Sequence, residues 1–262
     1  MNLLNPSVAV DPIHQFQITR WIEFHPGGID LSFTNASGFM ALGVILTIAF
    51  FGIAASKGSL VPSRLQSMAE IGYGFVADMV RGTAGEEGLK FFPFVFTLFF
   101  FIFFANMIGM VPYAFTTTSH IIVTAALALL VMTIVIGYGF YKNGLKFLGL
   151  FAPSLGDMHI VGKICLYSLL IPIEVISFFA RPLTLSLRLF ANMLAGHIML
   201  KLFAGFAVIG MAVGGIGYLV TPLSFIMAVA LNALELLVAG LQAYVFAILT
   251  CVYLSDALHP SH

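Results

Sequence analysis

The most restrictive feature of this sequence is a run of 51 residues, Phe91 to Tyr141, that contains no Asp, Glu, Lys or Arg. A helix needs about 20 predominantly apolar residues to cross a bilayer, so the run is too long for one crossing. Pro112 and the polar string Thr116 to Ser119 interrupt it near its middle. The sequence therefore predicts a helical hairpin, with arms at about Phe92 to Met110 and Ile121 to Tyr141.

The composition of the whole chain is that of a protein whose solvent is lipid. Only 8% of its 262 residues are charged and 60% are apolar, whereas soluble domains carry about 25% charged residues. The 11 basic and 11 acidic residues balance, so we expect no nucleic-acid partner, since no basic surface is available. Cys165 and Cys251 stand alone, and we expect no disulfide framework, metal site or cofactor.

Charged residues divide the remaining chain, and the pattern predicts an all-α, polytopic membrane protein with about five membrane-embedded helices. We expect residues 1–35 on the outer side and a single helical membrane domain over residues 36–262. The uncharged stretch Phe39 to Ala55 predicts a first span. Residues 57–90 mix four basic and four acidic residues with apolar residues at helical spacing, which indicates an interfacial amphipathic helix on the inner side. Two long helices follow within residues 164–255.

The boundaries of these last two helices depend on prolines and glycines. Pro172 and Pro182 predict a break or kink in the first of them, because proline lacks the N–H group of the helical ladder. The glycines between Gly205 and Gly217 predict the turn that separates the two helices. We expect the last helix to run from about Pro222 to Leu254.

The orientation follows from the excess of lysine and arginine in cytoplasmic loops. With the N-terminus outside and the C-terminus inside, the outer segments hold only Arg20. The inner segments then hold Lys57, Arg64, Arg81, Lys90, Lys142, Lys146 and Lys163.

Polar side chains inside apolar stretches gather in the last third of the chain. They are Glu174, Arg181, Arg188, Asn192, His197, Lys201, Glu235 and Gln242. An arginine at the bilayer centre costs about 2.5 to 3.5 kcal/mol on insertion scales, so Arg188 requires a partner or a function. Helical geometry places Asn192 on the face of Arg188 and His197 on the opposite side. In the last helix, Asn232, Glu235, Gln242 and Tyr253 are predicted to form one stripe.

Two polar stripes in lipid indicate a path for a proton or another ion, with Glu and His as titratable stations and Arg as a fixed charge. Each residue also has a simpler interpretation. Glu174 and Arg181 form a structural ion pair, or Arg181 and Lys201 extend to the interface. Asn192 and Gln242 serve as hydrogen-bonding contacts between helices. The concentration of these residues in two helices favours the path.

Several strings of this sequence resemble one known family. Ser186 to His197 reads SLRLFANMLAGH, Asn106 to Pro112 reads NMIGMVP and Asp11 to Phe16 reads DPIHQF, and Glu235 precedes Gln242-Ala243-Tyr244. On these residues the chain resembles subunit a of F-type ATP synthases, over essentially its whole length. The resemblance is to the alphaproteobacterial and mitochondrial members.

The resemblance implies roles for the polar residues. The last two helices would lie strongly tilted against a ring of c subunits, with Arg188 facing the carboxylates of the ring and separating two half-channels. His197 and Glu235 would line the outer half-channel, in an order of proton transfer that the resemblance leaves open. Asn192 would line a channel, Gln242 would lie near Arg188, and Glu174 would belong to the inner exit.

The same resemblance implies partners and a location. The partners are the c-subunit ring, the b subunits of the peripheral stalk, the rest of the F-type ATP synthase and membrane lipid. The location is a bacterial inner membrane or, alternatively, a mitochondrial inner membrane. We expect no bond-making chemistry in the chain itself. The alternative function is a stand-alone secondary cation/proton transporter, a class whose folds often contain inverted repeats, and no such repeat is evident here.

Overall fold

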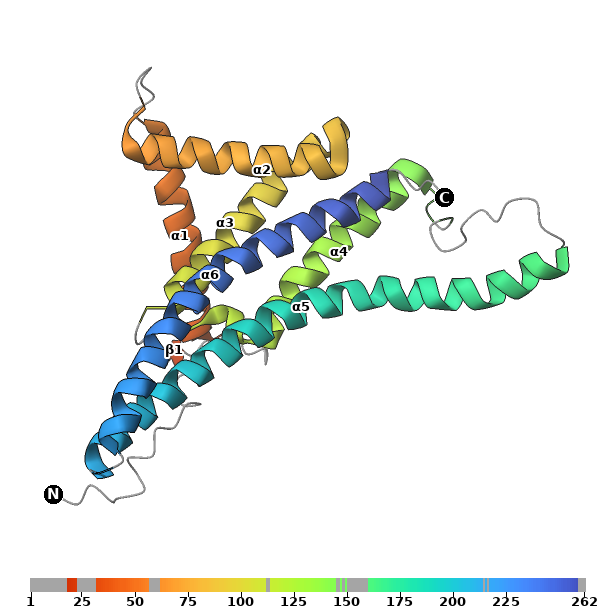
Figure 1. Cartoon of the computed structure of the whole chain (residues 1–262). Helices are drawn as coiled ribbons and strands as arrows, with labels where there is room; N and C mark the ends of the chain where they lie inside the picture. Colours follow the sequence, from red (N-terminus) through yellow and green to blue (C-terminus); the bar gives the residue numbers. More distant parts are fainter. Residues whose placement is uncertain are drawn as a thin grey trace. The chain divides into compact units, whose positions relative to one another are not determined.

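The structure is a computed structural model that describes residues 18–22, 32–56, 62–111, 114–144, 147, 149, 160–213, 215 and 217–258. Within these residues the chain is almost entirely helical (Figure 1). The helices are α1 (Asn35–Ser56), α2 (Arg64–Gly88), α3 (Phe92–Gly109), α4 (Ile121–Asn143), α5 (Ile160–Val213) and α6 (Gly217–Leu258). Short 3-10 turns, η4 (Leu89–Phe91) and η5 (Thr117–Ser119), precede α3 and α4.

Five of the described helices are long and apolar enough to cross a membrane, which confirms the prediction of an all-α polytopic protein. They are Asn35–Ser56, the continuous stretch Arg64–Gly109, Ile121–Asn143, Leu166–Met211 and Gly217–Leu258. The two arms of the predicted hairpin end within two residues of the ends of α3 and α4. The position of α2 relative to a membrane surface stays a prediction.

The N-terminal segment contains two short strands that the sequence did not indicate. The strands β1 (Arg20–Ile22) and β2 (Phe33–Thr34) pair antiparallel.

Several segments that carry sequence predictions lie outside the described residues. They are most of residues 1–35 with the DPIHQF string, Lys57, Lys146 and most of the connector before α5.

The chain divides into two compact units. The first comprises Met1–Ile48, Phe101–His120 and Leu189–Gln242, and the second comprises Ala49–Phe100, Ile121–Arg188 and Ala243–His262.

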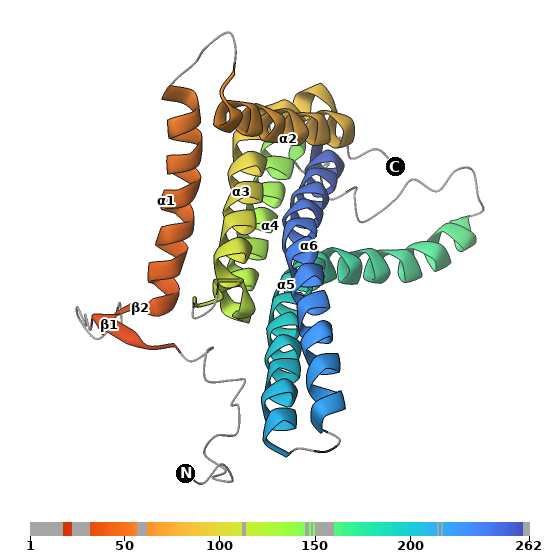
Figure 2. The ribbon, with the colours of Figure 1, turned by 60° about the vertical axis from the view of Figure 1, so that its left-hand side comes forward.

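In the first unit, the end of α5 and the beginning of α6 form a close hairpin, and the two helices lie side by side (Figure 2). A Cβ atom at Gly217 would lie 1.9 Å from the carbonyl oxygen of Gly210, so only glycine fits there. The Thr221 hydroxyl donates to the carbonyl oxygen of Ala207 at 3.2 Å. The turn holds Gly215 at a φ of 56°, a conformation that favours glycine. The glycines therefore form the predicted turn, but α6 begins at Gly217 rather than near Pro222.

In the second unit, α2 lies across the beginning of α3 (Figure 2). A Cβ atom at Gly72 would lie 2.8 Å from the ring of Phe100, so this glycine allows the ring to reach the backbone of α2. The Ser63 hydroxyl caps the N-terminus of α2 by accepting from the Gln66 N–H. Gly85 has a φ of 68° and interrupts the regular helix close to its end.

The second unit also ties the last turn of α6 to α4. The Lys142 ammonium donates to the carbonyl oxygen of Leu258 at 3.1 Å and forms an ion pair with Glu87. The Asn143 amide donates to the carbonyl oxygen of Ala257 at 2.8 Å. Both carbonyls belong to the last turn of a helix, where intrahelical donors are missing.

Of the predicted break or kink at the two prolines, the structure contradicts the break. α5 continues as one helix through Pro172 and Pro182. Proline is tolerated in membrane helices because neighbouring groups and small local adjustments satisfy the freed carbonyl groups.

Candidate functional site

A histidine and a glutamate meet in the interior of the first unit. Nδ1 of His197 on α5 lies 2.6 Å from Oε1 of Glu235 on α6. The two residues are only 7% and 5% exposed. Gly196 makes this approach possible, since a Cβ atom there would lie 3.0 Å from Oε1 of Glu235. Such a pair can hold a proton on either partner, because histidine titrates near neutral pH.

A threonine completes this buried group from the loop after α3. The Thr116 hydroxyl lies 2.6 Å from Nε2 of His197, and Thr116 is 0% exposed. The same hydroxyl donates to the carbonyl oxygen of Gly109 at 3.3 Å. A Cβ atom at Gly109 would lie 2.7 Å from Cγ2 of Thr116. The sequence indicates Thr116 only as part of the polar break between two spans. Its hydroxyl in so apolar a run was the one signal of a buried polar side chain beside it.

Asn106 joins the same unit to α6. Its side-chain amide donates to the carbonyl oxygen of Ala239 at 3.1 Å, and the residue is completely buried. Ala239 lies four residues, about one helical turn, after Glu235. Asn106 therefore holds α3 against the part of α6 that carries the glutamate.

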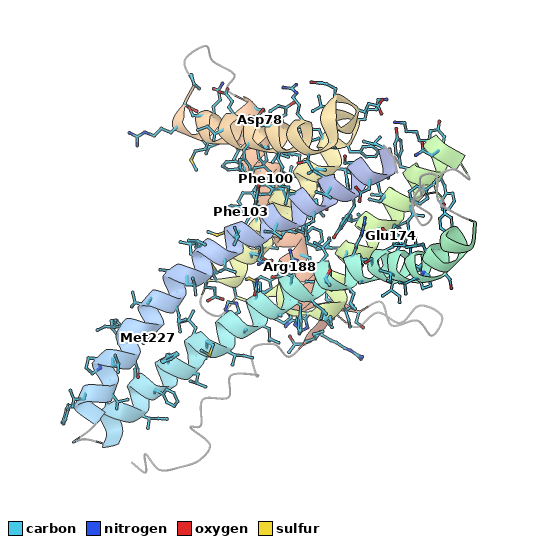
Figure 3. The ribbon with its side chains drawn as sticks, turned by 45° about the vertical axis from the view of Figure 1, so that its right-hand side comes forward. Asp78, Phe100, Phe103, Glu174, Arg188 and Met227 are labelled. Atoms are coloured by element: carbon cyan, nitrogen blue, oxygen red, sulfur yellow. The ribbon has the colours of Figure 1, made fainter. Side chains whose placement is uncertain are left out.

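Two other polar residues of α5, Arg188 and Asn192, do not lie on the buried side of the helix that carries His197. Arg188, labelled in Figure 3, and Asn192 are both exposed, whereas His197 is buried. Among the residues that the structure describes, no acidic side chain forms an ion pair with Arg188.

The predicted stripe of α6 is only partly buried. Glu235, Gln242 and Tyr253 are buried, but Asn232 is exposed. Three helical positions rotate a side chain by about 300°, so Asn232 lies about 60° from Glu235 and turns outward. Gln242 forms no hydrogen bond within the described part of the chain.

The second unit contains a different charged group. Nη1 of Arg181 lies 2.8 Å from Oδ2 of Asp256, while Nη2 lies 4.0 Å from Oε1 of Glu174. The guanidinium also lies over the ring of Tyr253, with 5.3 Å from Cζ to the ring centroid. Asp256 was missed because α6 continues to Leu258, past the predicted end of the helix. Arg181 is therefore held chiefly by Asp256, and Glu174 is the more distant partner.

Within the described residues, no group of three or more His, Cys, Asp or Glu side chains is arranged to hold a metal ion. The ionisable groups occur as pairs instead. Together with the membrane-length helices, they define a polytopic α-helical membrane protein with titratable side chains buried between two long helices.

Comparisons with known proteins identify the family. The family model of the ATP synthase A chain matches residues 37–255. The chain is 70% identical to ATP synthase subunit a of Hyphomonas neptunium over 97% of this chain and 98% of that one. It is 57% identical to ATP synthase subunit a of Mesorhizobium japonicum, with 97% and 98% covered. Against Maricaulis maris the identity is 58%, with 96% and 98% covered. The chain belongs to the family of subunit a of the F-type ATP synthase.

Membership in this family confirms the resemblance drawn from the sequence motifs. It places the protein in a bacterial membrane, with a role in ATP synthesis and proton transport and with the rest of the F-type ATP synthase as its partner. This family membership excludes the alternative function of a stand-alone secondary transporter.

Proposed function

We propose that this chain is the stator subunit that provides two proton half-channels and a fixed arginine, Arg188, which couples proton transfer to rotation of a ring of c subunits. The observation that carries the proposal is the outward position of Arg188 on α5 without an acidic partner in the described chain. A carboxylate of the ring is the opposite charge that this position calls for.

The chemistry of arginine suits this role. Its guanidinium does not lose its proton in proteins, so it attracts a carboxylate into the ionised form but cannot pass a proton on. A proton arriving from one side therefore cannot cross directly to the other side at Arg188. One charge crossing 100 mV yields about 2.3 kcal/mol, so a rotor must collect several protons for each ATP.

The other polar residues divide between the two half-channels. His197 and Glu235 belong to the outer half-channel, which their burial and their 2.6 Å contact support. We assign Gln242 to the ring-facing path that Arg188 controls, and Asn192, which is exposed on α5, to the lining of a channel. Glu174 belongs to the inner exit.

The remaining partners and the orientation complete the proposal. The chain contacts the c-subunit ring with α5 and α6, both strongly tilted, and also contacts the b subunits of the peripheral stalk. It lies in the bacterial inner membrane with its N-terminus outside, as the distribution of basic residues favours. Charged residues such as Asp78 (Figure 3) support an interfacial position for α2 along the inner surface.

ATP-driven proton pumping by the whole complex in vesicles tests this function. We expect Arg188→Ala to abolish gradient-coupled pumping, because the ring carboxylate loses its fixed partner. Arg188→Lys should restore little of it, since an ammonium can lose its proton in an apolar site. The matched control is Arg64→Ala, which removes an exposed cation from α2 and should leave pumping unchanged. Coupled pumping by Arg188→Ala would overturn the proposal.

A further inference from the structure

We propose that Thr116 is a positioning residue for proton transfer, whose hydroxyl holds His197 in the tautomer that carries its proton on Nε2. This tautomer directs Nδ1 towards Glu235 as the nitrogen that exchanges the proton. The inference rests on the proposed outer half-channel and assigns the proton-exchanging atoms within it.

The single proton of the threonine hydroxyl can be donated to only one of its two neighbours. Thr116 Oγ1 lies within hydrogen-bond distance of two groups, the Gly109 carbonyl oxygen at 3.3 Å and His197 Nε2 at 2.6 Å. A carbonyl oxygen only accepts, and a hydroxyl has one proton to donate. When the hydroxyl donates to Gly109, the short contact is a hydrogen bond only if Nε2 is the donor.

The orientation of Thr116 is itself held by its surroundings. The Ser119 hydroxyl donates to the carbonyl oxygen of Thr116 at 2.6 Å, and the Ser119 N–H donates to the same oxygen at 3.2 Å. Gly109 leaves space for the threonine methyl group, where a Cβ atom would lie 2.7 Å away. The hydroxyl is therefore fixed against the imidazole ring rather than free to turn away.

A proton on Nε2 leaves Nδ1 as the nitrogen that faces Glu235, 2.6 Å from Oε1. This contact has ion-pair distance but not hydrogen-bond geometry, so the exchange requires the carboxyl group to turn towards Nδ1. In one state a neutral His197 accepts from a protonated Glu235, and in the other an imidazolium donates to a carboxylate. The transfer moves one proton from Oε1 to Nδ1, and the pair has no net charge before or after it. A buried pair avoids an uncompensated charge in this way.

Pumping by three variants of the whole complex tests the role of the hydroxyl. Thr116→Val keeps the shape of the side chain and removes the hydroxyl. We expect pumping to fall about tenfold, the lower end of the cost of losing a partner that orients a metal-bound histidine. Thr116→Ser keeps the hydroxyl and should restore pumping to within about twofold of the unsubstituted complex. The matched control is Thr118→Val, since the Thr118 hydroxyl is equally buried and has no hydrogen-bond partner in the described chain.

A purely structural role predicts a different result. The proposal is overturned if Thr116→Val pumps as well as Thr118→Val, or if Thr116→Ser is no better than Thr116→Val. If the threonine variants give either of these results while Arg188→Ala abolishes pumping in the same assay, the role of Thr116 is contradicted and the proposed function is not. If Arg188→Ala pumps normally while the threonine series behaves as expected, the proposed arginine role fails and the inference stands.

The tautomer can also be observed without substituting Thr116. In a complex with ¹⁵N-labelled histidine rings, solid-state NMR distinguishes a protonated Nε2 from an unprotonated one, and the signal lost in His197→Gln identifies the residue. We expect Nε2 of His197 to be protonated in the unsubstituted complex. An unprotonated Nε2 would contradict the proposal even if the Thr116→Val complex failed to assemble.

Discussion

Among the described residues, each of the two units contains one ion pair that links α5 to α6, and the two pairs differ in burial and in chemistry. In the first unit the pair is His197 with Glu235, 8% and 4% exposed by side chain. In the second unit it is Arg181 with Asp256, 24% and 37% exposed. The same two helices are thus linked once by a base that can release its proton and once by a base that cannot.

Burial explains why each pair occurs where it does. Removing two permanent charges from water costs several kcal/mol per ion, and their attraction offsets this only with excellent geometry. A histidine and a glutamate avoid that cost because both can be neutral. Of these two ion pairs, the more buried one, His197 with Glu235, is therefore the one that can transfer a proton. The side chains of Arg181 and Asp256 stay partly exposed.

The largest effect should follow from removing the carboxyl group of the buried pair. Glu235→Gln keeps the size of the side chain but cannot take part in proton exchange, so we expect ATP-driven pumping to fall at least about 100-fold, as for other losses of an acid–base group. Asp256→Asn, the equivalent change in the half-buried pair, is the matched control. An equal loss of pumping in Glu235→Gln and Asp256→Asn would contradict the claim that only the buried pair transfers protons.

A smaller effect is expected in the half-buried pair of Arg181 and Asp256, and it should concern stability rather than transport. A double-mutant cycle with Arg181→Leu and Asp256→Leu should give a coupling free energy of about 1 kcal/mol or less, since partly exposed ion pairs contribute little. Thermal unfolding of the purified complex measures this coupling, and pumping should stay within about twofold of the unsubstituted complex. A coupling several times larger would show that this pair is as isolated from solvent as the other.

The smallest effect concerns a second histidine of the first unit, His120, which lies between the spans and stacks on the ring of Phe115 with centroids 4.9 Å apart. Burial lowers the pKa of His120 below its usual value. Below about pH 6.5 the unfolded chain then binds a proton that the folded chain does not, so stability falls as the pH decreases and is constant above that value.

His120→Gln removes this proton uptake, and we expect its thermal midpoint to decrease less than that of the unsubstituted complex between pH 7 and pH 5. The midpoints of the two complexes should coincide at pH 7.5. If both proteins lose stability in parallel on acidification, His120 is not the group that titrates.

The sequence predicted the spans well because charge is so scarce in this chain. The ends of α3 and α4 follow from the limits of one uncharged run, and the turn before α6 follows from its glycines. It predicted two long helices within residues 164–255 but left open a break at Pro172 and Pro182, because the effect of a proline depends on its neighbouring groups.

The candidate site shows the same division. Helical periodicity placed Arg188 and His197 on opposite faces of α5, and the structure has one exposed and the other buried. Thr116 and Asp256 could not be paired with their partners from the sequence, because 81 and 75 positions separate them from His197 and Arg181. Contacts at such separations depend on how the helices pack, which no local pattern encodes.

The attachment of the last turn of α6 to α4 has a consequence for the biosynthesis of the chain. The donors that cap the carbonyl groups of Ala257 and Leu258 belong to Lys142 and Asn143, more than 110 residues earlier. A ribosome therefore completes α4 long before the carbonyls it caps exist. The final turn of α6 enters a membrane in which its cap is already present, and a chain that ended a few residues earlier would leave these two donors without their acceptors.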